Sequence, residues 1–276
     1  FGFESRRSPV LARNGIVATS QPLAAQAGLE ILRAGGNAAD AAVAAAVALN
    51  VVEPTSSGIC GDCCCLFYNA QDRRVYAVNG SGRAPAALTI EMLNAAGCNG
   101  EMPRRGAHAV TVPGTAAGWQ DTVARHGRLS LATVLAPAIR IAEEGHPVAP
   151  LISRAWQSSA DVLGSASPNG AEMLLNGRGP RAGEIRKNPN LANVLRAVAG
   201  GVHDPATVLI NDVMLGRLVA AQCPVCGGLV VMRELAETHN IRIEDRSEST
   251  RWGLGGLAHT EPGETDRRHR CPGARV

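Results

Sequence analysis

The N-terminal part of the chain alternates apolar runs with breaks marked by glycine and proline. Residues 15–19, GIVAT, predict a short strand, and SQPLAAQAGLEILRAGG predicts a helix with Pro22 in its first turn and Gly35 at its end. The next run, NAADAAVAAAVALNVV, begins at Asn37 and places Asp40 where an acid favours a helix N-terminus. Because this second helix is almost entirely alanine and valine, we expect it to be buried on most sides.

The pattern then changes to alternation and back to helical spacing. Two runs, 63–68 and 74–79, flank the polar turn NAQDRR and predict a hairpin. AHAVTVPG predicts another strand, and 157–187 is less regular. Pro137 is expected to kink its helix or to start a new one. The further predicted helices are 87–95, TAAGWQDTVARHG, SLATVLAPAIRIAEEG, NPNLANVLRAVAG and NDVMLGRLVAAQ.

The end of the chain differs in character from the rest. Residues 251–276 are dominated by arginine, glycine and proline and show no periodicity. We therefore divide the chain into one folded region, 1–250, and an irregular tail, 251–276, which is disordered or foreign to the fold.

Composition narrows the classes of protein to consider. Hydrophobic residues make up 45% of 276 residues but aromatic residues only 3%, so small aliphatic side chains must fill the core around Trp119 and Trp156. The net charge of +3 is small and the basic residues are scattered, which argues against nucleic-acid binding. The longest apolar run, 41–49, is well below the ~20 residues that span a membrane. No signal peptide is visible, which favours the cytoplasm.

Half of the eight cysteines lie in one stretch, PTSSGICGDCCCLFYN. Adjacent cysteines are poorly placed for separate disulfides, so we expect reduced thiols. One alternative is a zinc site, because Cys60 and Cys63, and again Cys223 and Cys226, have the spacing of zinc ligands. The other is that the thiols are small buried hydrophobic groups. No cofactor is expected.

The order of several motifs resembles a known family. GIVATSQPLAAQAGLEILRAGGNAADAAVAAAVALNVVEPTSSGICGD is similar to the N-terminal signature of the gamma-glutamyltransferase (glutathione hydrolase) family, and VNGSGRAPAALTIEM, AVTVPGTAAGW and GEIRKNPNLANVLRAVA continue the resemblance over roughly 8–235. The NGSGRAP form resembles the glutamyltransferase-like branch. The resemblance implies an α+β N-terminal-nucleophile (Ntn) hydrolase, a four-layer αββα sandwich of which this chain is an incomplete, large-subunit part with a helical C-terminal half.

The resemblance also implies a self-cleaving precursor whose small subunit begins with the nucleophilic threonine. In the family that threonine is one of a pair after a glycine and before a histidine. The most similar stretch of this sequence is GGLAHTEPG, around His259 and Thr260, which lacks the threonine pair. No residue of this chain is therefore predicted to be catalytic. The chain looks truncated, and its expected partners are a small-subunit-like chain and a small gamma-glutamyl or related amide.

Two positions in GSGRAP are the candidate substrate-binding residues. Family members place an arginine that binds the substrate carboxylate four residues before the AP proline, where this chain has Ser81. Arg83 lies two residues closer and could bind the same anion. Asp62 is expected to orient a loop by accepting backbone N–H bonds, and Glu53 and His108 are expected to be structural.

Three functions remain open. The first is the scaffold of an amide hydrolase or acyltransferase that is inactive as an isolated chain. The second is a non-catalytic, truncated paralogue that binds a partner, and the third is a zinc-stabilised binding protein.

Overall fold

The fold is known from a computed structural model, which describes residues 8–85, 88–98, 100–102, 107–166 and 169–200. Its helices are α1 (Pro22–Arg33), α2 (Ala38–Val52), α3 (Ile90–Ala95), α4 (Thr115–His126), α5 (Leu131–Glu144), α6 (Pro150–Ser158), α7 (Ala160–Ala166) and α8 (Pro189–Ala199). Its strands are β1 (Cys63–Asn69), β2 (Arg74–Gly80), β3 (His146–Pro147) and β4 (Ile185–Arg186), and short 3-10 turns cover Ala107–Ala109 and Gly170–Met173.

The starts of the long helices follow from their capping residues. Asn37 accepts hydrogen bonds from the backbone N–H groups of Ala39 and Asp40, and Asp40 accepts one from the Asn37 N–H, so a capping box begins α2 as predicted. Ser130 caps α5 by accepting from the Thr133 N–H, and Asn188 caps α8 in the same way. These local bonds satisfy N–H groups that a helix leaves free at its first turn.

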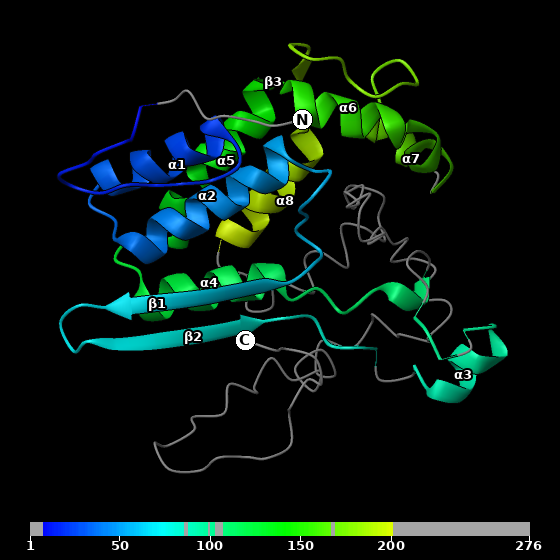
Figure 1. Cartoon of the computed structure of the whole chain (residues 1–276), viewed down its shortest axis with the longest axis horizontal. Helices are drawn as coiled ribbons and strands as arrows, with labels where there is room; N and C mark the ends of the chain where they lie inside the picture. Colours follow the sequence, from blue (N-terminus) through cyan, green and yellow to red (C-terminus); the bar gives the residue numbers. More distant parts are fainter. Residues whose placement is uncertain (1–7, 86–87, 99, 103–106, 167–168, 201–276) are drawn as a thin grey trace.

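Four helices form the main core. Helix α2 packs against α1 and α5, and α5 packs against α8 (Figure 1). Alanine, valine and leucine fill this core, as the composition predicts, and α2 is buried along most of its length. Trp119 of α4 is only 1% exposed and adds the bulk that the small side chains lack.

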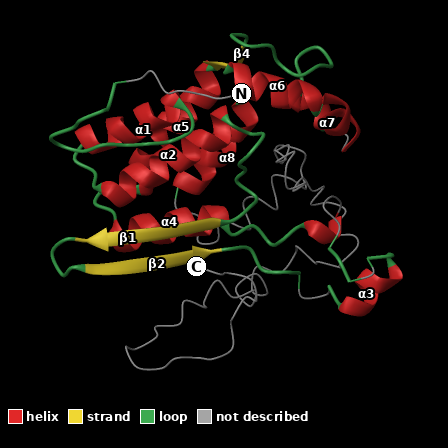
Figure 2. Ribbon diagram, viewed as in Figure 1, coloured by secondary structure: helices red, strands yellow, loops and turns green. Residues whose placement is uncertain are grey.

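Helix α4 separates this core from the predicted hairpin, which the structure confirms (Figures 1 and 2). Strands β1 and β2 are antiparallel, with Cys63 opposite Gly80 and Asn69 opposite Arg74. Side chains of β1 alternate between half-buried positions toward α4 and exposed positions. At the turn end, the His126 ring stacks on Phe67 with ring centroids 5.0 Å apart.

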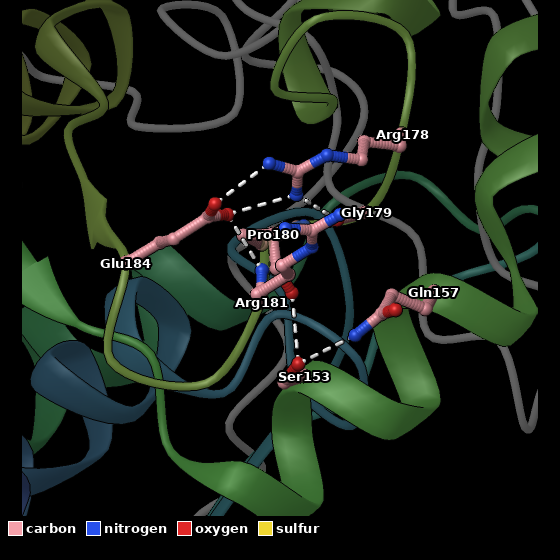
Figure 3. A network of polar contacts seen from close by, with 7 residues as sticks. All are labelled: Ser153, Gln157, Arg178, Gly179, Pro180, Arg181 and Glu184. Carbon is pink, nitrogen blue, oxygen red and sulfur yellow. Dashed lines mark hydrogen bonds and ion pairs between the residues drawn. The ribbon is translucent and has the colours of Figure 1, made fainter.

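A second, smaller core lies around α6 and α7. Trp156 is 2% exposed, and its Nε1–H donates to the Met173 carbonyl oxygen at 2.8 Å. The region after α7 was expected to be less regular, yet it is held by side chains. Arg178 binds both carboxylate oxygens of Glu184, and the Ser153 hydroxyl donates to the Pro180 carbonyl oxygen (Figure 3).

Two predicted strands are wrong. Residues 15–19 run beside α1, where Val17 meets the backbone at Gly28, so helix packing rather than strand pairing shapes them. The second, AHAVTVPG, forms a 3-10 turn followed by an extended segment in which Val110 and Pro113 are buried. Helix α5 also continues through Pro137 undivided, whereas a second helix was one of the two outcomes expected there.

The described residues contain mixed helix and strand, with two-stranded sheets β1–β2 and β3–β4. Within this part of the chain, no helix is both long and apolar enough to cross a membrane. The predicted helix NDVMLGRLVAAQ and the boundary at residue 250 lie outside the described residues.

Candidate functional site

Three segments meet at the end of the hairpin that lies away from its turn. The loop 81–83, called the site loop below, leaves β2 and crosses the extended segment 111–114 that leads into α4. A Cβ on Gly82 would overlap the Thr111 hydroxyl and the Val112 carbonyl oxygen, and a Cβ on Gly114 would overlap the Gly80 carbonyl oxygen. The two backbones can approach this closely only because glycine occupies both positions.

The loop before β1 joins them. The Gly61 carbonyl oxygen accepts hydrogen bonds from the N–H groups of Gly114 and Thr115, at 3.1 and 3.0 Å. These N–H groups belong to the start of α4 and would otherwise need another partner. The cysteine-rich stretch is thus a connection that ties the end of α2 to the start of α4.

Each residue of the predicted site loop has a backbone tether. The Ser81 N–H donates to Asn79 Oδ1 at 3.0 Å, and the Gly82 N–H donates to Asp62 Oδ1 at 2.7 Å. The Arg83 carbonyl oxygen accepts from the Val112 N–H at 2.8 Å. The side chains of Ser81 and Arg83 remain exposed. The loop therefore presents a hydroxyl and a guanidinium to solvent from a fixed backbone.

Asp62 behaves as predicted, although its hydrogen-bond partner is distant in the sequence. It accepts from the backbone of a loop 20 residues away rather than from its own. Glu53 also has a structural role: its carboxylate accepts from the Ser20 hydroxyl at 2.6 Å and from the Gln21 amide at 3.0 Å. His108 is half-buried in the 3-10 turn before the extended segment.

The thiols of Cys60 and Cys63 are held in their neutral form. Burial raises the pKa of Cys60 to about 12. Burial, and then the neighbouring thiols of Cys65 and Cys64, raises the pKa of Cys63 to about 11. The raised pKa keeps the thiols of Cys60 and Cys63 protonated at neutral pH. Both pack against the main core, as the buried-hydrophobe interpretation expects.

Several candidate residues cannot be placed. Cys223, Cys226, His259 and Thr260 lie outside the described residues. Within the residues that the structure does describe, no three His, Cys, Asp or Glu side chains gather as a metal site would require. Sequence reasoning singled out Ser81, Arg83 and Asp62 but missed Asn79 and Gly61, whose contacts depend on the crossing of separate segments.

The comparison with known families decides what the chain is related to. The gamma-glutamyltranspeptidase family matches residues 24–245. The chain belongs to the gamma-glutamyltranspeptidase family. This confirms the resemblance in the motifs, which span both the site loop and the helical core.

Individual relatives of this family include acylases and glutathione hydrolases. The chain is 37% identical to the acylase ACY 1 proenzyme of Pseudomonas sp. (strain SE83), over 88% of its own length and 44% of the acylase. It is 31% identical to glutathione hydrolase 2 of Arabidopsis thaliana, over 86% of its length and 39% of that protein. The chain thus spans less than half the length of these relatives.

Solved structures agree. The crystal structure of cephalosporin acylase from Bacillus halodurans matches 86% of this chain with a TM-score of 0.69 and 40% sequence identity. The chain covers 44% of that acylase. Gamma-glutamyltranspeptidase from Pseudomonas nitroreducens, complexed with L-DON, matches 82% of the chain with a TM-score of 0.63 and 30% identity.

Proposed function

We propose that this chain supplies the large-subunit scaffold of an Ntn hydrolase that hydrolyses an amide or transfers its acyl group. The observation that carries the proposal is the match to cephalosporin acylase, at 40% identity and a TM-score of 0.69 over most of the chain. The αββα sandwich belongs to the same proposal, with β1 and β2 as part of one of its sheets.

The nucleophile in this proposal comes from polypeptide that pairs with the chain. No threonine pair followed by a histidine occurs in the 276 residues. The N-terminal threonine hydroxyl of the partner attacks the donor carbonyl while the threonine's own amine takes the hydroxyl proton; the amide C–N bond then breaks, and that proton goes to the departing amine of the donor. The acyl group then passes from the threonine oxygen to water or to an acceptor amine. The role of this chain is to bind and orient the donor.

The donor-binding element is the site loop. Arg83 offers a planar guanidinium, which binds a carboxylate through two parallel hydrogen bonds, and Ser81 offers a hydroxyl two residues before it. Because Ser81 stands where an arginine is expected, we place the carboxylate of the donor at Arg83. This shift favours donors other than ordinary gamma-glutamyl compounds.

The hairpin carries the surface for the partner. Leu66, Tyr68 and Val75 lie on its outer face and are 79%, 58% and 64% exposed. Apolar side chains on a two-stranded sheet with open edges are typical of a face that another segment covers. Since the relatives are more than twice as long as this chain, we propose that the segment with the nucleophile covers this face.

The test is to express the chain together with the small subunit of an acylase relative. Turnover is measured with a gamma-glutamyl anilide and with a matched anilide that keeps the carboxylate but lacks the α-amino group. We expect turnover by the pair and none by the chain alone. Arg83→Ala should raise KM for the donor at least tenfold, whereas Arg33→Ala, at the exposed end of α1, should not.

Each part of the proposal can fail separately. A folded pair that cleaves neither donor contradicts the enzymatic function and favours the non-catalytic binding alternative. An active pair in which Arg83→Ala leaves KM unchanged contradicts the place assigned to the donor carboxylate.

A further inference from the structure

We infer that Asp62 is a positioning residue that holds the donor-binding loop in the geometry that a substrate carboxylate requires. The inference rests on the proposed function of that loop. It starts from one contact, in which Asp62 Oδ1 accepts a 2.7 Å hydrogen bond from the Gly82 N–H across 20 residues of sequence. An ionised acceptor makes such a bond stronger than one between neutral groups.

Gly82 is the critical residue of the loop because it lies between the two side chains proposed to meet the donor. Its α-carbon lies against the Thr111 side chain and the Val112 backbone, with no room for a Cβ. The N–H of Gly82 is bound by Asp62, so the peptide is held by packing against 111–112 and by this hydrogen bond. Both fix the direction in which Ser81 and Arg83 leave the backbone.

The other two tethers do not replace this one. The Ser81 N–H is bound by Asn79, which belongs to the same short segment, and the Arg83 carbonyl oxygen is bound by the Val112 backbone. Asp62 reaches the middle of the loop from a separate segment. Without its carboxylate, the peptide between Ser81 and Arg83 is held only by its packing against 111–112 and by the anchored ends of the loop.

The backbone on both sides of Asp62 is itself fixed by hydrogen bonds, so its carboxylate can hold the site loop in one position. Its preceding residue, Gly61, accepts two N–H groups from the start of α4, and its following residue, Cys63, pairs with Gly80 at the edge of the hairpin. Asp62 thereby links the start of α4 and the start of β1, through its backbone neighbours, to the site loop, through its carboxylate. Correct orientation of a binding group contributes strongly to rate, and small displacements are costly.

The consequence is specific to donor binding and acylation. Asp62→Ala in the two-subunit protein should lower kcat/KM for the acyl donor about tenfold or more, mainly through KM. The rate of deacylation, which no longer depends on the donor carboxylate reaching Arg83 from solution, should change little. Asp62→Asn keeps an oxygen that accepts the Gly82 N–H and should recover most of the loss.

A matched control exists in the hairpin turn. Asp72 Oδ1 accepts the Arg74 N–H at 3.0 Å. Like Asp62, it is an exposed acid that binds a backbone N–H, but its partner lies only two residues away. Asp72→Ala should leave the donor KM unchanged. The double variant Asp62→Ala/Arg83→Ala should be no worse than Arg83→Ala alone, because both changes remove the same interaction. Hydrogen exchange at Gly82 should be faster in Asp62→Ala and restored in Asp62→Asn.

The outcomes separate this inference from the function on which it rests. A wild-type pair that turns over no donor overturns the proposed function and this inference with it. An active pair in which Asp62→Ala has the wild-type KM, or in which its effect adds fully to that of Arg83→Ala, overturns the inference alone. The same holds if Asp72→Ala raises KM as much as Asp62→Ala does.

Discussion

Asp40 and Arg128 are joined by a hydrogen bond that connects the start of α2 to the turn between α4 and α5. Asp40 Oδ2 accepts the Arg128 N–H at 2.9 Å, across 88 residues, and also the Asn37 N–H at 2.9 Å. The Asp40 side chain is fully buried. A capping residue that begins one helix therefore also positions the turn that precedes another.

Removal of this carboxylate should be strongly destabilising. Asp40→Ala leaves the N–H groups of Asn37 and Arg128 without their acceptor, and we expect a loss of about 2–4 kcal/mol in the free energy of unfolding, measured by urea denaturation. The matched control is Thr89→Ala, which removes the cap of α3, a helix without buried residues, and should cost less than about 1 kcal/mol. Equal losses in the two variants would contradict the role given to Asp40.

The close approach of Gly82 to the segment 111–112 predicts a second effect on stability. Gly82→Ala forces the site loop and the segment 111–112 apart, since a Cβ would overlap both Thr111 and Val112. We expect a loss of about 1–3 kcal/mol in unfolding free energy, from thermal or urea denaturation.

Gly164→Ala in α7 is the control for that substitution. The nearest atom to its new Cβ is Leu174 Cδ1 at 3.5 Å, an ordinary contact, so alanine should be neutral or stabilising by up to about 1 kcal/mol. If Gly82→Ala has the same free energy of unfolding as the wild type, the site loop and the segment 111–112 are not in close contact.

The buried histidine of β3 predicts how stability depends on pH. Burial, and to a lesser extent Arg186, lowers the pKa of His146 to about 4. In the unfolded chain the pKa is about 6.5, so the unfolded state binds a proton between these values while the folded state does not. Stability should therefore fall as pH drops from about 6.5 to 4, by at most about 3 kcal/mol.

Urea denaturation at a series of pH values tests this dependence. His146→Gln removes the titrating group and should flatten the stability profile between pH 4 and 6.5. His126→Gln, at a half-buried ring that stacks on Phe67, should keep most of the wild-type slope. An unchanged slope in His146→Gln would assign the pH dependence to other groups.

The ion pair of Figure 3 predicts a local effect on the loop before β4. Hydrogen bonds from Arg178, and from the backbone N–H of Arg181, lower the pKa of Glu184 to about 2. This stabilisation is complete above a pH of about 4.5 and is lost as pH falls toward 2. At neutral pH, Glu184→Gln should free the loop, and trypsin should cleave after Arg178 and Arg181 several-fold faster. Glu30→Gln, which breaks the exposed pair with Arg140, should leave both sites as slow as in the wild type.

The features that could be predicted from the sequence are those with local causes. The start of α2 follows from Asn37 and Asp40, which lie three residues apart, and the hairpin follows from two alternating runs around one polar turn. The predicted strands at 15–19 and in AHAVTVPG are wrong: the first packs beside α1, and the second forms a 3-10 turn and an extended segment, so their place in the fold depends on tertiary packing.

At the candidate site, too, local features could be predicted from the sequence and tertiary contacts could not. Ser81 and Arg83 were found through motif resemblance, and their role in binding stays a prediction. The contacts that hold their loop depend on the crossing of segments far apart in the sequence, such as Asp62 with Gly82, and Gly61 with the start of α4. No periodicity or local spacing contains that information, because it arises only when the hairpin packs on α4.

The most direct test of the account is to locate the covalent intermediate. The chain, paired with a family small subunit, is treated with a slowly hydrolysed acyl donor, and both chains are mapped by mass spectrometry. We predict that the acyl group is found on the N-terminal threonine of the partner and that these 276 residues remain unmodified. An acyl group on any side chain of this chain would contradict the account.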